Sequence, residues 1–203
     1  DKYATAKHFP ELSPKTQLVH SYEEYLKTLE GWGLKGERLV LKKNFETEGR
    51  GIFILKTEEI HEGLYEDWKD VLVQEFLDSS LGIPGIVEGL HDLRVTVING
   101  EPINAYIRQP KTGSFLANIS LGGSCTYIDM KDLSPQVFEY IKVISEKFKK
   151  YNPSVYAVDF MNSAKGFKLI ELNSRPGLQV VSVEGDYNAF NSSLVDMLVK
   201  AVT

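Results

Sequence analysis

The amino-acid sequence predicts an α+β fold of two lobes, each built from an antiparallel sheet and helices. Strands come as hairpins, and the strongest signal is the Asn99-Gly100 pair between two stretches of alternating apolar and polar residues. The hairpins are interleaved with helical patterns, which favours antiparallel sheets over a parallel one. The length of 203 residues suits one or two compact lobes.

The N-terminal part of the chain alternates between helical and strand patterns. Ser21 and Glu24 form a capping box, and Gly33 ends the helix that they open. Pro14 disfavours helix at the residue before it, so its neighbourhood is extended. We predict a short helix at residues 1–9, an extended segment at 11–19 and the capped helix at 21–32. Two hairpin strands follow at 38–43 and 52–55, then another helix at 58–68 and a buried strand at 71–77.

The C-terminal part begins with a loop rich in Gly and Pro at residues 79–89. After it come the hairpin strands within residues 93–108 and an amphipathic helix at 133–151, whose apolar residues recur at helical spacing. Two more strands follow, joined by residues 162–166, and a last helix spans 191–202. We divide the chain into an entry segment at residues 1–14, a smaller lobe at 15–75 and a larger lobe at 76–203. Ligand clefts form preferentially between lobes.

Composition excludes several classes of function. The net charge of −5 argues against broad attraction to nucleic acid or to an anionic membrane. Cys125 is the single cysteine, so no intrachain disulfide forms, which fits a reducing, cytoplasmic setting. No apolar run approaches the roughly 20 residues of a membrane-spanning helix. Walker, dinucleotide-binding and serine-hydrolase motifs are absent, and the four histidines have no ligand spacing.

Two strands near the C-terminus place carboxylates opposite each other. With the turn centred on Lys165, Asp159 lies opposite Glu171 and Phe160 opposite Ile170. The predicted apolar face holds Val158, Phe160, Ile170 and Leu172, and the other face holds Asp159, Glu171 and Asn173. Opposed like charges are destabilising unless a cation lies between them. These oxygen donors suit Mg²⁺ or Mn²⁺, although a solvated face neutralised by nearby lysines would look the same.

Basic residues next to turns offer places for phosphate. Lys42 ends an apolar strand before the flexible turn of Gly49, Arg50 and Gly51, whose N–H groups are of the kind that cradle phosphate oxygens. Arg94 and Arg108 lie far from the tip of their hairpin, and arginine holds phosphate and carboxylate through two parallel hydrogen bonds. A plain hairpin with a solvated lysine, and a pair of exposed arginines, are the alternatives.

Taken in order, these motifs resemble the ATP-grasp superfamily. The ordered set is "DK", "LVLKK…EGRG", "VLVQEFL", "HDLRVTVINGEPINAYIR", "FLANISLGGS" and "VDF…LIELNSRPG". It looks closest to the branch of RimK-like ribosomal-protein glutamate ligases and bacterial glutathione synthetase. The resemblance covers nearly the whole chain. It implies a two-lobed fold with ATP bound between the lobes, and a domain that precedes the matched "DK" in the family.

The activity that the resemblance implies is amide-bond formation between a carboxylate and an amine of amino acids or peptides, through an acyl phosphate. The cofactors would be ATP and two Mg²⁺ ions, with Mn²⁺ as a substitute. No nucleic acid or membrane partner is implied, and homo-oligomerisation is left open. An ATP-grasp kinase acting on a small-molecule hydroxyl, and a nucleotide-binding domain without turnover, remain as alternatives.

The resemblance also assigns roles to individual residues. Catalytic roles fall to Arg108, Lys42 and Arg94. Nucleotide contacts fall to Lys2, Lys42, Gly49, Arg50, Gly51, Gln74, Glu75, Phe76, Leu77 and Asp78. Substrate contacts fall to Arg108, Asn118 and Arg175, and metal ligation to Asp159, Glu171 and Asn173. The sequence departs from the family pattern at Lys43, at Glu46 and Glu48 in the phosphate loop, and at Arg175, which is a candidate to hold a substrate carboxylate.

Overall fold

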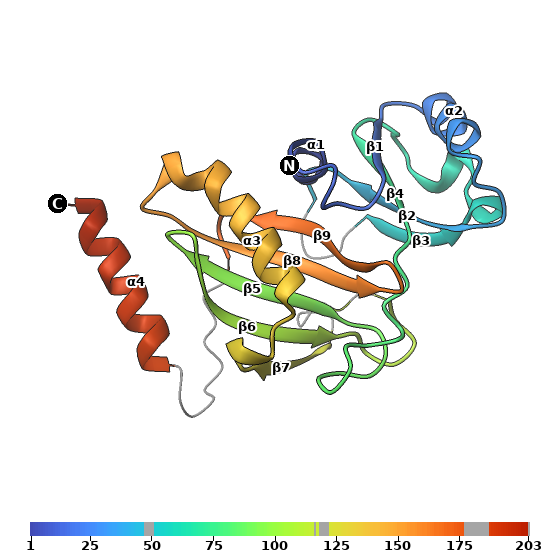
Figure 1. Cartoon of the computed structure of the whole chain (residues 1–203). Coiled ribbons are helices and arrows are strands. Elements are labelled where there is room, and N and C mark those ends of the chain that lie inside the picture. Colours follow the sequence, from blue (N-terminus) through green and yellow to red (C-terminus); the bar gives the residue numbers. More distant parts are fainter. Residues whose placement is uncertain (47–50, 116, 118–121, 177–186, 203) are drawn as a thin grey trace. The chain divides into compact units, whose positions relative to one another are not determined.

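The computed structural model describes residues 1–46, 51–115, 117, 122–176 and 187–202. The chain divides into two units, Asp1–Leu77 and Asp78–Thr203. Each unit contains an antiparallel sheet together with helices, as Figure 1 shows. The predicted α+β class is therefore confirmed.

The first unit is built on a sheet of four antiparallel strands in the order β1-β4-β2-β3. Their bounds are Thr16–Val19 for β1, Arg38–Lys43 for β2, Ile52–Lys56 for β3 and Val71–Glu75 for β4. Two helices accompany the sheet, α1 (Lys2–His8) and α2 (Tyr22–Trp32).

Helix α2 begins and ends where its capping residues predict. The Ser21 hydroxyl accepts a hydrogen bond from the Glu24 N–H at 3.1 Å, and the Glu24 carboxylate accepts one from the His20 N–H at 2.8 Å. Gly33 ends the helix with φ of 65°, a left-handed conformation that glycine adopts without a steric penalty.

The helix predicted at residues 58–68 is wrong. The segment forms only two 3-10 turns, η1 (Thr57–Glu59) and η2 (Glu62–Leu64). The buried side chains here are Ile60, Tyr65 and Trp68, and a spacing of five residues does not keep two side chains on one helix face. An irregular backbone lets all three reach the core, and burial outweighs local helix propensity.

The core of the first unit covers one face of its sheet. Leu39 and Leu41 of β2 and Val71 and Val73 of β4 all belong to one buried cluster. Because successive side chains point to opposite faces, Lys42 and the other alternate residues of these strands lie on the opposite face. The same pattern that builds the core therefore presents a lysine on the other side of the sheet.

The second unit is built on a sheet of five antiparallel strands in the order β7-β6-β5-β8-β9. Their bounds are Asp92–Ile98 for β5, Glu101–Gln109 for β6, Ser124–Ile128 for β7, Val155–Ser163 for β8 and Gly166–Asn173 for β9. Strand β7 has no counterpart among the predicted elements. The predicted Asn99-Gly100 turn is confirmed, with positive φ at both residues, 53° and 91°.

One face of this sheet packs against α3 (Pro135–Phe148), which lies across the strands in Figure 1. Val137, Ile141 and Ile144 are its buried residues. The Tyr140 ring contacts Phe160 of β8, with ring centroids 6.2 Å apart. The face that carries Phe160 is therefore the apolar one, and its alternate neighbours in the strands point to the other face.

The register of β8 and β9 confirms one half of the prediction and corrects the other. Asp159 lies opposite Glu171, as predicted. A bulge then shifts the register, so that Phe160 lies opposite Leu169 and not Ile170. Leu169 is fully buried, whereas Ile170 is partly exposed. The extra residue at the bulge lets the strand bury Leu169 while Glu171 still faces Asp159.

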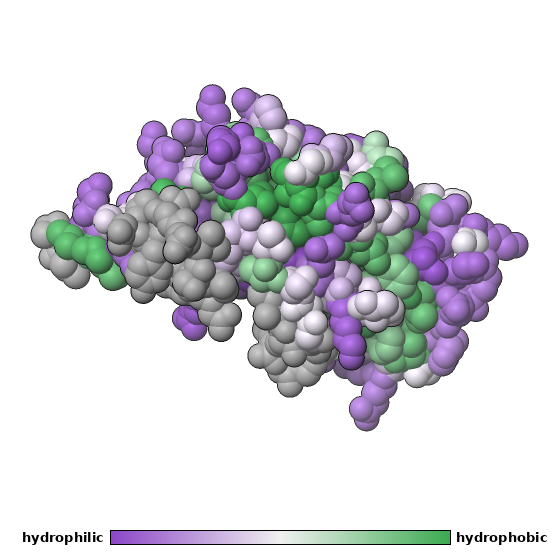
Figure 2. All heavy atoms as spheres, turned by 90° about the horizontal axis from the view of Figure 1, so that it is seen from below, coloured by the Kyte–Doolittle hydropathy of each residue, from purple (hydrophilic) through white to green (hydrophobic). Residues whose placement is uncertain are grey.

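Helix α4 (Tyr187–Val202) is longer than the predicted helix at 191–202. It packs through Leu194 and Met197 against apolar residues of the second unit. Val195 and Leu198 are exposed, and apolar atoms are visible at this end of the molecule in Figure 2. Within the described ranges, no helix has the length and apolar character needed to cross a membrane.

Candidate active site

The face of the five-stranded sheet opposite α3 gathers charged residues from neighbouring strands. Asp92 of β5 lies opposite Arg108 of β6, and Arg94 of β5 lies opposite Asp159 of β8. Asp159 in turn lies opposite Glu171 of β9. Directly opposed residues share a face, so the register alone places all five side chains on one side of the sheet.

Four of these side chains form a continuous ion-pair network. Arg94 donates to Asp159 from Nε and Nη2, both at 2.6 Å. Arg108 donates to Asp92 from Nε at 2.6 Å and from Nη2 at 2.8 Å. The Nη2 of Arg108 also reaches Oδ2 of Asp159 at 3.0 Å. These side chains are 6–14% exposed, so little solvent screens the pairs.

The network shifts the pKa values of all four of its members. Burial acts to lower the pKa of both arginines, but hydrogen bonding and charge from Asp159, and from Asp92 at Arg108, raise the pKa of each. Burial acts to raise the pKa of Asp159, but the two arginines outweigh it and lower that pKa. Asp92 behaves differently, because burial outweighs Arg108 and raises its pKa to about 7. Asp159 is therefore the firmly anionic carboxylate.

The three predicted metal ligands suit a hard cation by their chemistry. Glu171 is half-buried, and its carboxylate has no ion pair or hydrogen bond within the described part of the chain. The side-chain oxygen of Asn173 accepts one hydrogen bond from the Arg175 N–H at 2.9 Å, which leaves a second lone pair. Among the described residues there is no cluster of three His, Cys, Asp or Glu side chains for a metal. The amide of Asn173 would therefore be the third oxygen donor beside the two carboxylates, a set that fits Mg²⁺ or Mn²⁺.

In the first unit, the predicted phosphate lysine lies in a polar chain on its sheet face. Lys42 is 6% exposed, and its Nζ donates to Oε1 of Gln74 at 3.0 Å. The Nε2 of Gln74 then donates to the Thr16 hydroxyl at 2.7 Å. Lys2 in α1 donates to the backbone carbonyl of Glu46, just before the predicted phosphate loop. The sheet thus brings Lys42 and Gln74 together although 32 residues separate them.

The remaining predicted residues lie near strand ends or outside the described ranges. Glu75 ends β4, and the Arg38 guanidinium lies over the Phe76 ring at 5.6 Å. The Asp78 carboxylate accepts a hydrogen bond from the Ser80 N–H at 2.9 Å. Arg175 is exposed. Of the other predicted positions, Leu77 is buried and Gly51 has φ of 65°. Gly49, Arg50 and Asn118 lie outside the described residues.

Asp92 is the residue of the network that sequence reasoning missed. It is 8% exposed and holds Arg108 through two hydrogen bonds. A signal was present, because Asp92 and Arg94 are two residues apart in a strand and therefore share a face. The Asn99-Gly100 turn by itself would place Asp92 opposite Ile107, and the register shift between Thr96 and Val97 brings Arg108 opposite Asp92 instead.

His91, next to Asp92, is buried with one ring nitrogen unpaired. It is 1% exposed, and its Nδ1 lies 3.0 Å from the Gly89 carbonyl, to which it donates. Its Nε2 has no hydrogen-bond partner in the part of the chain that the structure describes. Burial lowers the pKa of His91, although backbone hydrogen bonds with Gly89 and Ser79 act in the other direction.

This lowered pKa predicts a loss of stability in acid. The unfolded chain binds a proton at His91 below a pH of about 6.5, whereas the folded chain resists it, so the free energy of unfolding falls as the pH drops. Denaturant unfolding at about pH 8 and about pH 5 should show that the free energy of unfolding falls less between these two pH values for His91→Gln than for the wild type. Asp92, whose pKa is raised, increases the free energy of unfolding as the pH falls over the same range. It does so in both proteins, so it does not account for a difference between them. Equal losses would contradict the prediction.

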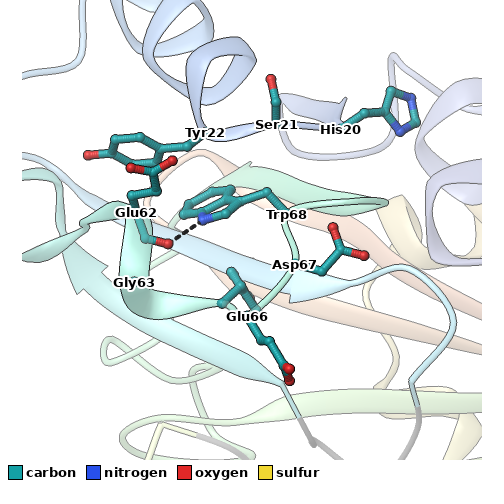
Figure 3. Close-up of a pocket in the computed structure, with 9 residues that line it drawn as sticks. His20, Ser21, Tyr22, Glu62, Gly63, Glu66, Asp67 and Trp68 are labelled. Carbon is teal, nitrogen blue, oxygen red and sulfur yellow. Dashed lines mark hydrogen bonds between the residues drawn. The ribbon is translucent and has the colours of Figure 1, made fainter.

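A hollow of about 620 Å³ lies elsewhere on the first unit, as Figure 3 shows. It is lined by the start of α2 and by residues 62–68, and the Trp68 Nε1 donates to the Glu62 carbonyl at 2.7 Å. Tyr65 and Trp68 belong to the core cluster on the sheet face opposite Lys42. None of the residues singled out for nucleotide, metal or substrate lines this hollow.

Solved structures of similar architecture identify the fold. The chain matches the ATP-grasp ligase PsnB complexed with a phosphomimetic variant of minimal precursor, Mg and ADP, with a TM-score of 0.62, 15% identity, and coverage of 97% of this chain and 58% of that one. It matches the D-alanine–D-alanine ligase of Bacillus anthracis complexed with ATP, with a TM-score of 0.61, 18% identity, and coverage of 98% and 64%. The fold is therefore that of the ATP-grasp ligases.

Sequence comparison then gives the family. The model of the RimK-like ATP-grasp domain matches residues 6–197, so the chain belongs to this family. A protein named probable alpha-L-glutamate ligase from Syntrophotalea carbinolica is 31% identical over 193 residues, which are 93% of this chain and 57% of that protein. The predicted resemblance is confirmed. The chain spans between about a third and just over half the length of the curated relatives that it matches.

Proposed function

We propose that this chain is the nucleotide- and metal-binding part of an ATP- and Mg²⁺-dependent carboxylate–amine ligase. The observation that carries the proposal is the sheet face of the second unit, where Asp159 and Glu171 lie beside Arg94 and Arg108. Carboxylates for a dication next to arginines for phosphate are what phosphoryl transfer requires. Membership of the RimK-like family, together with a relative named probable alpha-L-glutamate ligase, supports the same conclusion.

The reaction that we infer has two steps. An oxygen of the substrate carboxylate attacks the γ-phosphorus of ATP, the bond to the bridging oxygen breaks, and ADP leaves. The amine nitrogen then attacks the acyl carbon, loses a proton to solvent, and expels inorganic phosphate from the acyl phosphate. Bound Mg²⁺ supplies neutralisation of the phosphate charge. The chain itself has to position the reactants and supply fixed positive charge, and no covalent enzyme intermediate is needed.

In this scheme Lys42 neutralises nucleotide phosphate, with Lys2 and the glycine turn around Arg50 as further phosphate contacts. Gln74 to Asp78 contact the base and ribose. Arg94 and Arg108 face the transferred phosphoryl group, and Asn118 and Arg175 contact substrate. Asp159, Glu171 and Asn173 would hold two Mg²⁺ ions, for which Mn²⁺ would substitute. The burial of Lys42 beside Gln74 supports its part in this scheme, because a cation so well shielded interacts more strongly with an anion than an exposed one.

The substrates that we propose are an amino acid or a peptide on both the acid and the amine side. The relatives carry the name alpha-L-glutamate ligase, and one solved neighbour was complexed with its precursor. An exposed Arg175 beside the metal ligand Asn173 fits a substrate with a free carboxylate. A reducing, cytoplasmic location is part of the proposal, because the chain has a single cysteine.

The test is phosphate release from ATP and Mg²⁺ in a matrix of amino acids and short peptides. We expect release only where an acid and an amine are both present, with an amide product of matching mass. Formation of ADP with one acceptor, a stable phosphoester and no release of inorganic phosphate would indicate a kinase and overturn the ligase. Nucleotide binding with no release across the matrix would indicate a domain without turnover. Glu171→Gln serves as the control for contaminating ATPases.

A further inference from the structure

We propose that Asp92 is a positioning residue that keeps Arg108 in place when Asp159 binds a metal ion. The inference rests on the proposed function, because it assumes that Asp159 ligates a dication. It adds a residue that family resemblance did not supply, and it separates the roles of two arginines that the sequence alone treats alike.

Arg108 makes more hydrogen bonds with Asp92 than with Asp159. Its Nε and Nη2 donate to the two oxygens of Asp92 at 2.6 and 2.8 Å. This is the parallel two-bond arrangement that fixes the plane of a guanidinium group. Only one bond, from Nη2 at 3.0 Å, joins Arg108 to Asp159. Nη1, with two further N–H groups, donates to none of the described residues. Asp92 thus determines the orientation of Arg108 and leaves one edge open to an anion.

At Asp159, a dication would compete with the two arginines for the carboxylate oxygens. Both of its oxygens accept hydrogen bonds from Arg94, and Oδ2 also accepts one from Arg108. A dication that binds these oxygens replaces arginine N–H groups. Arg108 would keep Asp92 as its carboxylate partner. Arg94 has no second carboxylate partner among the described residues and keeps only the Tyr106 hydroxyl, so the same event would release it from its ion pair.

The two arginines therefore have different tasks. Arg108 stays fixed by Asp92, with Nη1 available to a phosphate or acyl-phosphate oxygen. Arg94 moves away from Asp159 as the metal arrives and becomes available to the phosphates. Without the negative charge of Asp92, Arg108 would have only Asp159 as a carboxylate partner, and it would oppose the dication there as Arg94 already does. Removing the charge of Asp92 should therefore weaken metal binding at a site that Asp92 itself does not touch.

The experiment measures Mn²⁺ binding to the full chain in the presence of saturating ADP, by electron paramagnetic resonance of free Mn²⁺, at about pH 8 so that Asp92 is anionic. We expect Asp92→Asn to raise the Kd for Mn²⁺ by about 10-fold, which corresponds to about 1.4 kcal/mol. Arg108→Gln removes the competitor and should bind Mn²⁺ at least as tightly as the wild type. In the Arg108→Gln background, Asp92→Asn should have no further effect on the Kd. This dependence on Arg108 is a result that simple damage to the strand would not give.

Thr96→Ser is the matched control, because Thr96 is a buried polar residue of the same strand and the same face. Its Kd for Mn²⁺ should equal that of the wild type. The proposal is overturned if Asp92→Asn binds Mn²⁺ like the wild type, or if it weakens binding equally with and without Arg108. Should Asp92→Asn not fold, weaker binding by Arg108→Gln alone would overturn it. Failure of the wild type to bind Mn²⁺ and ADP would reject the metal assignment of the proposed function itself, which separates the two outcomes.

Discussion

Glu171→Gln is expected to abolish nucleotide turnover while leaving the fold intact. The change removes one negative charge from the proposed metal site and keeps the shape of the side chain. Loss of a group that only supports a metal ligand costs about 10- to 100-fold in metal affinity or activity, so loss of a ligand should cost more than about 100-fold. Glu171 is half-buried and has no described ion pair, so the free energy of unfolding should change by less than about 0.5 kcal/mol.

Two measurements on one preparation check this result. Phosphate release with ATP and an active acid–amine pair gives the turnover, and denaturant unfolding gives the stability. The matched control is Lys168→Gln, a charge-removing change on the same strand on the other side of the bulge, for which we expect turnover near that of the wild type. If Glu171→Gln turns over like the wild type, Glu171 is not a metal ligand.

Asp159→Asn is expected to lower the free energy of unfolding by about 3–5 kcal/mol, the usual cost of removing one partner of a buried ion pair. Asp159 is 6% exposed and accepts hydrogen bonds from both Arg94 and Arg108. An amide supplies one oxygen and no charge to two buried cations. This variant should also lose turnover, but for two reasons at once, which makes it a poorer test of the metal site than Glu171→Gln.

A double-mutant cycle separates the two contributions. Arg94→Gln in the Asp159→Asn background removes the cation that lost its partner, so the double variant should recover part of the lost stability while remaining inactive. Unfolding in urea, followed by circular dichroism, provides the free energies. If the loss of stability in the double variant equals the sum of the losses in the two single variants, the Arg94–Asp159 pair is not coupled. That result would be contrary to the two hydrogen bonds of 2.6 Å within the pair.

Much of the fold follows from short-range signals that can be recognised in the sequence. The Ser21 and Glu24 capping box, Gly33 at the end of α2 and the Asn99-Gly100 turn act over a few residues, and each appears in the structure where it was predicted. Family membership was also within reach of the sequence, because it depends on the order of motifs and not on their packing.

What failed were predictions in which packing overrides local preference. Residues 58–68 have a helix-compatible composition, but the burial of Ile60, Tyr65 and Trp68 requires irregular backbone. The bulge beside Ile170 was equally invisible, because strict alternation assigns one residue to each opposite residue. Strand β7 is itself an edge strand that pairs with β6, and its sequence after two glycines has no clear period.

The sequence by itself determined which residues are the candidates for chemistry: the carboxylates Asp159 and Glu171, and the arginines Arg94 and Arg108. Only the tertiary structure decided how they are engaged. Arg94 and Asp159 are 65 residues apart, and Arg108 and Asp159 are 51 apart, and they meet only because β5 pairs with both β6 and β8. A sheet brings distant residues together by register, and register is fixed by the packing of the whole face. That is why the engagement of Arg108 by Asp92, and its sharing with Asp159, could not be read from the chain alone.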